Sequence, residues 1–366
     1  MTLTQSLIQD TSRFEQTQLN IEKDNWNWCD PSRYDGARPA YYYEASLTPW
    51  QNGAPLARDA ACDVLVIGGG LLGASAALHL AEAGVDTILV DKHHIGSAAS
   101  GRNGGQLTPG LARWEAADMI EHLSHDDAKR LWRFASAESM DLIDAIGARY
   151  ALDLDRKRGH ITATVHPGHT SALLDGADAR RSLGDPSVTL VGKHQLQEYV
   201  RSGLYHGAAI DAMGGQIHPL ALVRGNRLLF GGQGTGTCWA QPDVNAYLLD
   251  RLNTVFPQYG QFALDYCWSG VSDFTLNGAT DSRKAEGNVP VYMVQGWSGH
   301  GVAQTVRIGK AICGDFVGRN DDFSMLTGID HREIPLGRQL SPIAIPAAKA
   351  AMSVMNAINP GKMISF

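Results

Sequence analysis

The chain has 366 residues, a formal net charge of −7 and five cysteines. A chain of this length can bury one large core or two modest ones, and 44% hydrophobic with 19% charged residues is typical of a folded protein and excludes a disordered one. The acidic balance argues against a nucleic-acid partner, because no surplus of Lys and Arg is available to neutralise phosphates.

The cysteines are scattered and lack CxxC spacing, which predicts reduced thiols and neither a disulfide framework nor a metal site. The N-terminal residues carry Asp10 and Glu15 and no apolar signal-peptide segment. No uncharged apolar run is long enough to span a bilayer, and Pro346 and Lys349 interrupt the nearest one, which favours a docked amphipathic helix. These features predict a cytoplasmic protein.

A strand, a helix and a second strand are predicted from Cys62 onward. Residues 1–60 are rich in aromatics and predict an extended arm with short helical turns at most. CDVLVIG then indicates a buried strand, GGLLGASAALHLAEAG a helix that ends at Gly84, and DTILVD the next strand. Strand, helix and strand within about thirty residues predict a parallel βαβ unit.

The rest of the chain gives a coarser pattern. Residues 112–150 predict helices, 155–165 a strand, and the stretch up to about 225 helix and loop. A β-rich region follows (RLLFGG, ALDYCWSGV and PVYMVQGW), and helices near 302–316 and 343–357 close the chain.

A glycine motif sits between the first strand and the first helix. Gly68, Gly70 and Gly73 fit the pattern GxGxxG. In this motif the first glycine permits the tight turn, the second lets a pyrophosphate approach the backbone, and the third lets the helix pack closely against the strand. Asp91 ends the second strand, where a carboxylate accepts hydrogen bonds from ribose hydroxyls and disfavours a 2′-phosphate. A glycine-rich turn in an ordinary α/β protein is the alternative interpretation.

A second loop of small residues follows Asp91 without a crossover helix. It reads SAASGRNGGQ, from Ser97 to Gln106, and it offers backbone N–H groups to a cofactor. Arg102 and Asn103 can reach a phosphate or a flavin edge, and Arg102 can also pair with a substrate carboxylate or lock the loop. A solvent-exposed loop is the other reading.

At this point the chain resembles the D-amino-acid-oxidase-like flavoproteins, the family of the glycine and sarcosine oxidases, and within it the gamma-glutamylputrescine oxidoreductases. The resemblance rests on CDVLVIGGGLLGASAALHLAEAG, IGSAASGRNGGQL, GGQIHPLALVRG, RLLFGG, FPQYGQFALDYCWSG and YMVQGWSGHGVAQT, which follow the family's order over most of residues 60–315. It implies FAD as the cofactor. No cysteine lies beside GWSGHGV, so the covalent cysteinyl link of some relatives is not indicated.

The resemblance also implies which residues hold FAD. The glycine motif and the end of the second strand would bind the ADP half, the second loop would line the flavin, and the loop before the 302–316 helix would return to its pyrimidine edge. The cofactor-binding residues expected are Gly68, Gly70, Leu71, Leu72, Gly73, Asp91, Lys92, Ser100, Gly101, Arg102, Asn103, Gly104, Gly105, Gln106, Gly299, His300, Gly301 and Val302.

Two departures from the family stand out. In relatives a block the size of a small domain separates HPLALVRG from RLLFGG, whereas here Gly225 and Asn226 are adjacent. Either a segment is omitted at this junction or the chain is a deletion variant. In addition, ATDSRK at 279–284 replaces a turn that usually contains proline near the flavin.

The expected fold is therefore α/β, a Rossmann-like FAD-binding domain of the glutathione-reductase type with a mixed-sheet substrate domain, shortened between Gly225 and Asn226. The expected division is an arm (1–60), the first part of the FAD domain (61–150), a truncated substrate domain (151–290), and the returning FAD domain with C-terminal helices (291–366).

The expected reaction is oxidative deamination of an amine, with a gamma-glutamylated polyamine as substrate and O2 as acceptor. His300 and Arg102 are the candidate catalytic residues, and Trp268 and Trp297 the candidate pocket walls. No metal is expected, because hydride transfer to a flavin needs none. The alternatives are an oxidase or dehydrogenase of small amino acids (glycine, sarcosine or D-amino acids) and a non-catalytic, incomplete flavoprotein.

Overall fold

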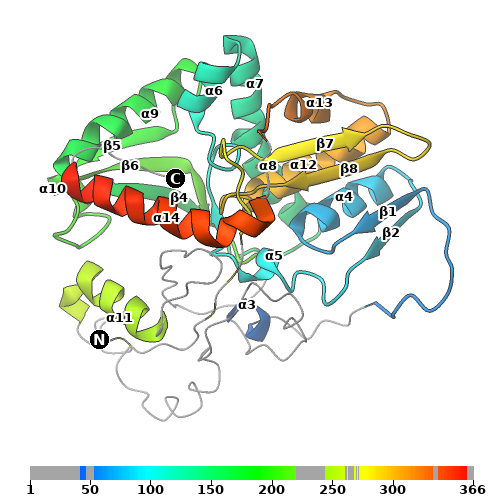
Figure 1. The fold of residues 1–366 in the computed structure, drawn as a ribbon, viewed down its shortest axis with the longest axis horizontal. Helices are drawn as coiled ribbons and strands as arrows, with labels where there is room; N and C mark the ends of the chain where they lie inside the picture. The colour runs from blue at the N-terminus through cyan, green and yellow to red at the C-terminus, as the bar shows by residue number, and fades with distance from the viewer. Residues whose placement is uncertain are drawn as a thin grey trace, which may run out of the picture.

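The computed structural model describes residues 42–46, 53–219, 244–259, 262, 268, 270, 272–332 and 337–360. The elements nearest the glycine motif form one half of the molecule (Figure 1). They are β1 (Val64–Ile67), α4 (Leu71–Glu82), β2 (Thr87–Val90), β7 (Asp281–Ala285), β8 (Val291–Gln295), α12 (Val302–Phe316) and α13 (Asp322–Thr327).

The predicted βαβ unit is confirmed. β1 pairs with β2 in parallel, with Val64 opposite Thr87, and α4 runs between the two strands. Gly84 follows the helix with φ +81°, the left-handed conformation in which glycine ends helices. β7 and β8 form an antiparallel hairpin, and α12 follows β8 and packs beside α4.

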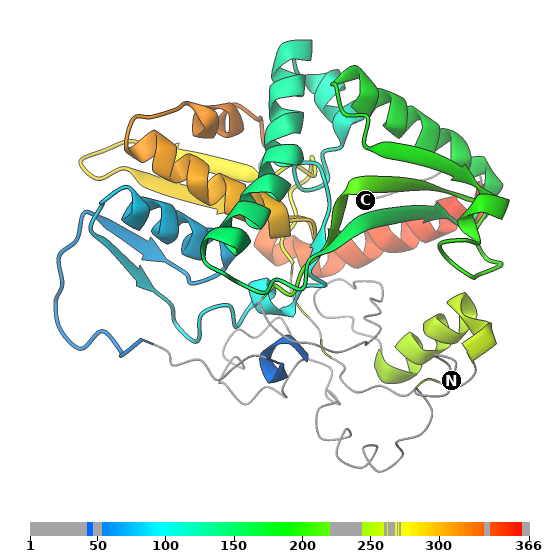
Figure 2. The same ribbon diagram turned by 180° about the vertical axis from the view of Figure 1, so that it is seen from behind.

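A second, antiparallel sheet forms the other half of the molecule, with helices over one of its faces (Figures 1 and 2). β6 (Gly207–Gln216) is its central strand and pairs with β3 (Gln106–Leu107), β4 (Lys157–Thr164) and β5 (Val188–Gly192). The strand predicted at 155–165 is thus confirmed. The prediction of helix and loop up to residue 225 is wrong for β5 and β6. β6 contains many small residues, which have low strand propensity, but it pairs with β4 on one side and with β5 on the other.

The helices of this half are α6 (Ala116–His122), α7 (His125–Ala135), α8 (Ala137–Arg149), α9 (Thr170–Ser182) and α10 (Lys193–Leu196). The first three confirm the helical prediction for 112–150. Ser124 begins α7 as a cap, since its hydroxyl accepts from the N–H of Asp127.

α12 joins the two halves through two hydrophobic cores. Its middle contributes Ile308 to a core with Trp132, Phe134 and Phe323, all at most 1% exposed. Its first residues, with Val302, pack in a second core with residues of α8 and the second sheet. The N-terminus of α12 therefore lies where the two halves meet.

The remaining elements are α3 (Tyr42–Ala45), α5 (Ala99–Arg102), α11 (Val244–Val255) and α14 (Gly337–Ile358). α3 is one short turn, as expected for the arm. The helices predicted at 302–316 and 343–357 are confirmed, the second with an earlier start. The Gly225–Asn226 junction, RLLFGG and most of ALDYCWSGV lie outside the described residues.

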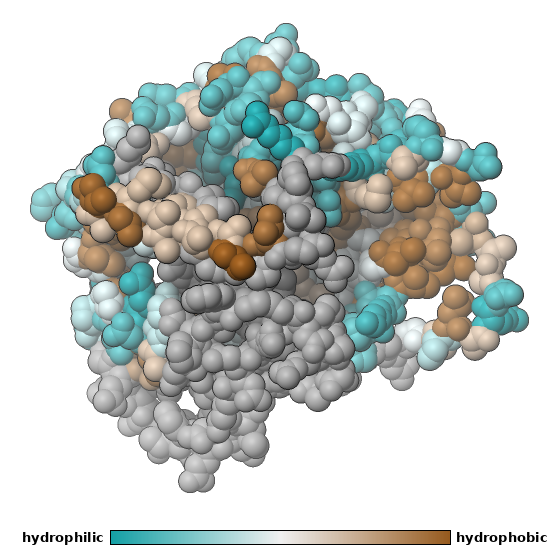
Figure 3. Space-filling view, viewed as in Figure 1, coloured by the Kyte–Doolittle hydropathy of each residue, from teal (hydrophilic) through white to brown (hydrophobic). Residues whose placement is uncertain are grey.

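Apolar side chains gather on one exposed face of the first half, over β1 and β8 (Figure 3). Leu65 and Ile67 of β1 are 53% and 81% exposed, and Val291 and Met293 of β8 are each 48% exposed. These four side chains alternate with inward-facing neighbours, so the outer side of both strands is apolar and uncovered by described residues.

Candidate FAD site

The glycine motif closes the turn between β1 and α4. Gly68 follows the last residue of the strand and has φ +105°, a backbone conformation that favours glycine. A Cβ at Gly73 would lie 1.9 Å from the carbonyl oxygen of Gly68, so no side chain fits there. The first turn of α4 is consequently pressed against the end of β1, as the motif predicts.

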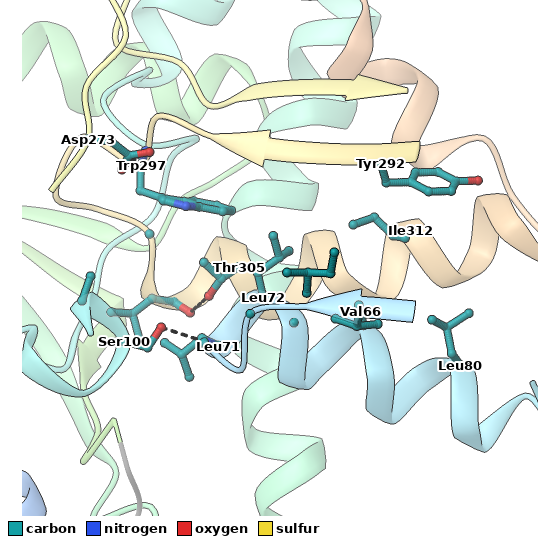
Figure 4. Close-up of a pocket in the computed structure, with 18 of the residues that line it drawn as sticks. Val66, Leu71, Leu72, Leu80, Ser100, Asp273, Tyr292, Trp297, Thr305 and Ile312 are labelled. Carbon is teal, nitrogen blue, oxygen red and sulfur yellow. Dashed lines mark hydrogen bonds between the residues drawn. The ribbon is translucent and has the colours of Figure 1, made fainter. Parts of the chain in front are cut away.

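Two side chains hold this turn. Ser100 Oγ accepts a hydrogen bond of 2.9 Å from the N–H of Leu71 (Figure 4). An Asp91 carboxylate oxygen accepts one of 2.7 Å from the N–H of Gly69. The first bond within α4 runs from Ala74 N to the Gly70 carbonyl, so the N–H groups of Leu72 and Gly73 have no partner in the helix and remain for an anion.

The second loop, Ser100 to Gln106, is tied to itself and to the second sheet. The Asn103 amide donates to the carbonyls of Ala99 and Ser100 and accepts from the N–H of Gly105. Gly105, at φ +67°, accepts from the N–H of Ile217. Asn103 therefore locks the loop through its own hydrogen bonds, a role that the sequence reasoning did not assign to it.

The third loop joins β8 to α12. The Asp273 carboxylate accepts from the N–H of Gly296, and Ser298 has φ +49° and is buried. His300 lies in the loop, and its Nδ1 interacts with the carbonyl of Ala112 at 3.1 Å. Burial lowers its pKa, which favours a neutral ring at pH 7.

These three loops meet at one end of a cavity of about 900 Å³. Arg102 and Asn103 line it from the second loop and Trp297, Gly299 and Val302 from the third, whereas His300 is not among its lining residues. The first residues of α4 and α12 pack together there, with Leu71 against the core that holds Val302. Two helix N-termini thus direct their positive ends toward the same end of the cavity.

An aromatic cluster lies behind the second loop. Tyr43 of α3 contacts His218 edge-on at 4.7 Å and Trp268 at 5.8 Å between ring centroids. Trp268 Nε1 donates to the carbonyl of Arg102, and the Tyr43 hydroxyl faces Gly105. The structure thus brings Arg102 and Trp268 together, while Trp297 lines the cavity and Trp268 does not.

Tyr43 is the residue that sequence reasoning missed. It is 2% exposed, and burial raises its pKa to about 12. The dense aromatics of the arm were the available signal, but they did not indicate which ring is buried. Ser46 adds a hydrogen bond of 2.9 Å to Nε2 of His218, so this turn of the arm is fixed at the loop.

In the described part of the chain no group of three or more His, Cys, Asp or Glu side chains is placed to hold a metal ion. Over the same residues, no helix combines the length and apolar character needed to cross a membrane.

Comparison with known proteins explains the three loops. The family described as FAD dependent oxidoreductase (DAO) matches residues 63–237 and 224–314. The chain belongs to this family. Its members use FAD and act on the CH–NH bonds of amines and amino acids.

Two curated relatives match over most of their length. Gamma-glutamylputrescine oxidoreductase of Escherichia coli is 25% identical over 403 residues, which covers 82% of this chain and 94% of the relative. A probable oxidoreductase, OrdL, of Haemophilus influenzae is 23% identical over 415 residues, with 83% and 94% covered. In both, the alignment is longer than the 366 residues of this chain.

Solved structures support the fold. Glycine oxidases from Bacillus cereus and Geobacillus kaustophilus superpose with TM-scores of 0.55 and 0.57 at 14% identity. Each match covers 75% of this chain and 99% or more of the other. The expected FAD-binding fold is confirmed.

The relatives also bear on the Gly225–Asn226 junction. About 300 of the 366 residues, or 82%, are spread over 403 aligned positions of the Escherichia coli protein, so about 100 positions fall opposite gaps in this chain. The family itself matches in two pieces, 63–237 and 224–314, which overlap in this chain around the junction. The chain is therefore shorter than its relatives inside the matched region.

Proposed function

We propose that this FAD-dependent oxidoreductase oxidises a gamma-glutamylated amine of the gamma-glutamylputrescine type, with O2 as the electron acceptor. The similarity to the Escherichia coli enzyme, over 94% of that enzyme, carries the proposal. In the overall reaction a primary amine, O2 and water give an aldehyde, ammonia and hydrogen peroxide.

The residues of the three loops fit FAD. The sterically required glycine at 73 and the unpaired N–H groups of the first turn of α4 suit the pyrophosphate, and Asp91 lies beside the same turn for the ribose. Ser100 to Gln106 and Gly299 to Val302 would then hold the flavin. FAD supplies the acceptor for the hydride of the amine carbon.

This chain's own part is to hold that carbon in place and to stabilise charge. The N-terminus of α12, whose cap residue is Gly301, would favour negative charge on the reduced flavin. We also propose the domain division expected from the sequence, with the first and third loops in the FAD domain.

Trp297 is the proposed wall of the amine pocket, because it lines the cavity, and the aromatic cluster supports the second loop from behind. The ring of Trp297 suits the methylene chain of a polyamine, and we assign Arg102, which also lines the cavity, to a substrate carboxylate. Nδ1 of His218 is buried and has no hydrogen-bond partner among the described residues.

Anaerobic reduction tests the proposal. The visible spectrum of FAD-loaded protein is recorded, then gamma-glutamylputrescine is added without oxygen. We expect the flavin bands to bleach and, after oxygen is admitted, one peroxide to form per aldehyde. Persistent bands with gamma-glutamylputrescine but bleaching with glycine, sarcosine or a D-amino acid would contradict the proposed substrate. Aldehyde without peroxide would contradict O2 as the acceptor.

One observation favours a second candidate, an incomplete flavoprotein that binds FAD without turnover. About 100 aligned positions are missing, and the sheet that carries the glycine motif has two described strands, β1 and β2. FAD binding with no bleaching by any amine would favour this candidate.

A further inference from the structure

Three successive backbone N–H groups of the third loop are bound by one residue, Asp273. Its carboxylate accepts from the N–H of Gly296 at 2.5 Å and from the N–H of Trp297 at 3.3 Å. Its main-chain carbonyl accepts from the N–H of Ser298 at 2.8 Å. Successive N–H groups of a turn form a concave anion site, called a nest. Here the anion in that site is a side chain of the same protein.

The backbone of the third loop is unfavourable without such a partner. Gly296, Ser298 and Gly299 have φ values of +82°, +49° and +84°, and this left-handed conformation is costly for the serine. These residues belong to neither β8 nor α12, so the hydrogen bonds of those elements do not hold them. The bonds to Asp273 therefore stabilise the turn where it leaves β8.

The segment that carries Asp273 is itself anchored against the loop. The Thr275 hydroxyl donates to the carbonyl of Ala279 at 2.7 Å. A Cβ at Gly296 would lie 2.3 Å from Cγ2 of Thr275, so the segment and the loop are in close contact. Asp273 consequently presents its carboxylate from a fixed backbone.

The loop in turn carries the ring of Trp297, which is partly buried and lines the cavity. Asp273 lies beside the start of this side chain, and the ring points away from it into the cavity (Figure 4). A Cβ at Gly301 would lie 2.9 Å from Cβ of Trp297 and 3.0 Å from its Cγ and Cε3, so the ring rests on the cap residue of α12. Trp297 is thus held at its N–H by Asp273 and at its ring by Gly301.

We propose that Asp273 is a positioning residue for the oxidation of the amine, and that it acts on the substrate through Trp297. The proposal rests on the function proposed above, because Trp297 is the proposed wall of the amine pocket. By fixing the backbone on both sides of the Trp297 Cα, Asp273 sets the place of the ring before the substrate binds. Preorganisation of this kind increases affinity because the bound geometry need not be ordered on binding.

A direct ion pair between Asp273 and the amine is the competing role. Asp63 and Asp273 are the acidic residues among those that line the cavity in the described part of the chain. Both oxygens of the Asp273 carboxylate, however, already accept backbone N–H groups. The two roles differ in one measurable respect, since only the positioning role depends on the ring of Trp297.

The variants follow from these contacts. Asp273→Asn keeps one acceptor oxygen, for the short bond from Gly296, and places an amide N–H group opposite that of Trp297. Asp273→Ala removes both side-chain acceptors. The main-chain bond from Ser298 is kept in either variant, so the loop stays attached to the segment.

Asp63 is the matched control. It is an exposed acidic residue that lines the same cavity, and its carboxylate accepts from the N–H of Asp86 at 3.2 Å. It precedes β1, away from the third loop. Asp63→Asn therefore removes the same charge from the same cavity without touching Trp297.

The rate of anaerobic bleaching of the FAD-loaded protein is measured against the concentration of gamma-glutamylputrescine. We expect Asp273→Asn to raise the half-saturating concentration about fivefold or more and to leave the limiting rate within about twofold, because binding and not the reacting centre is affected. Asp63→Asn should change neither value. In a Trp297→Ala background, Asp273→Asn should have no further effect, because the ring on which it acts is absent.

Three results would overturn the proposal. Asp273→Asn and Asp273→Ala both match the parent protein; or Asp273→Asn has its full effect in the Trp297→Ala background, which indicates a direct contact with the amine; or the limiting rate falls while the half-saturating concentration is unchanged.

A second measurement needs no substrate. Amide exchange of the segment 296–298 in the resting protein should quicken about tenfold or more in Asp273→Ala and stay unchanged in Asp63→Asn. Equal exchange in Asp273→Ala and the parent protein would overturn the proposal even if no amine bleaches the flavin. Bleaching by glycine, sarcosine or a D-amino acid alone would refute only the proposed substrate, and the same comparison of variants is then made with that amino acid.

Discussion

The contact between α4 and α12 gives a sharp prediction, because it depends on a glycine. A Cβ at Gly309 of α12 would lie 2.7 Å from the backbone nitrogen of Ala76 and 2.8 Å from Cβ of Ser75. Backbone atoms of a packed helix cannot turn aside as a flexible side chain can. The substitution Gly309→Ala should therefore push the two helices apart.

A second glycine serves as the matched control. Gly176 lies inside α9, and a Cβ there would meet nothing within 4 Å. Alanine is favoured over glycine in a helix by about 1 kcal/mol, and this gain applies to both substitutions. Overpacking costs about 1–3 kcal/mol and applies only to Gly309. The difference in the free energy of unfolding between the two variants isolates that cost.

Urea denaturation followed by circular dichroism measures both variants. Gly176→Ala should be more stable than the parent protein by about 0.5–1 kcal/mol. Gly309→Ala should be less stable than Gly176→Ala by about 1–3 kcal/mol, with an unchanged m-value. Equal stabilisation of the two variants would refute the close approach of α4 and α12.

Three further predictions concern the glycine turn and two titrating groups. Gly73→Ala, whose Cβ would meet the Gly68 carbonyl at 1.9 Å, should weaken FAD binding in a fluorescence titration by about tenfold or more; unchanged affinity would contradict the role of the turn. Burial lowers the pKa of His218, because it disfavours the charged ring in the folded protein. The stability of the folded protein should therefore be full above about pH 6.5 and should fall as the pH drops toward the folded-state pKa of His218. The variant His218→Gln should show a weaker fall of the melting temperature over this pH range. For Asp185, burial raises the pKa, but bonds from Ser187 and the charge of Arg180 outweigh it and leave the pKa low. Its stabilisation is present above about pH 4 and lost in acid, so Asp185→Asn should cost about 3 kcal/mol at pH 7 and less at pH 3.

Local rules predicted the elements near the glycine motif well. β1 and β2 are short apolar runs, and α4 lies between two turns whose positive φ values favour glycine, at Gly68 and Gly84. β6 escaped prediction because Gly207, Ala208 and Ala209 have low strand propensity alone. It is a strand because β4 and β5 pair with it on both sides. Such pairing depends on the tertiary structure and cannot be predicted from a short stretch of sequence.

Side-chain direction within the site was harder to predict than position. Asn103 and His300 both lie in the loops where the sequence placed them. Their polar atoms, however, bond to backbone carbonyls, Asn103 to that of Ser100 and His300 to that of Ala112, which is far from it in the sequence. A short polar side chain such as Asn103 readily satisfies local backbone groups, whereas the contact of His300 depends on the tertiary fold. A motif therefore indicates which loop meets a cofactor more securely than which side chain does.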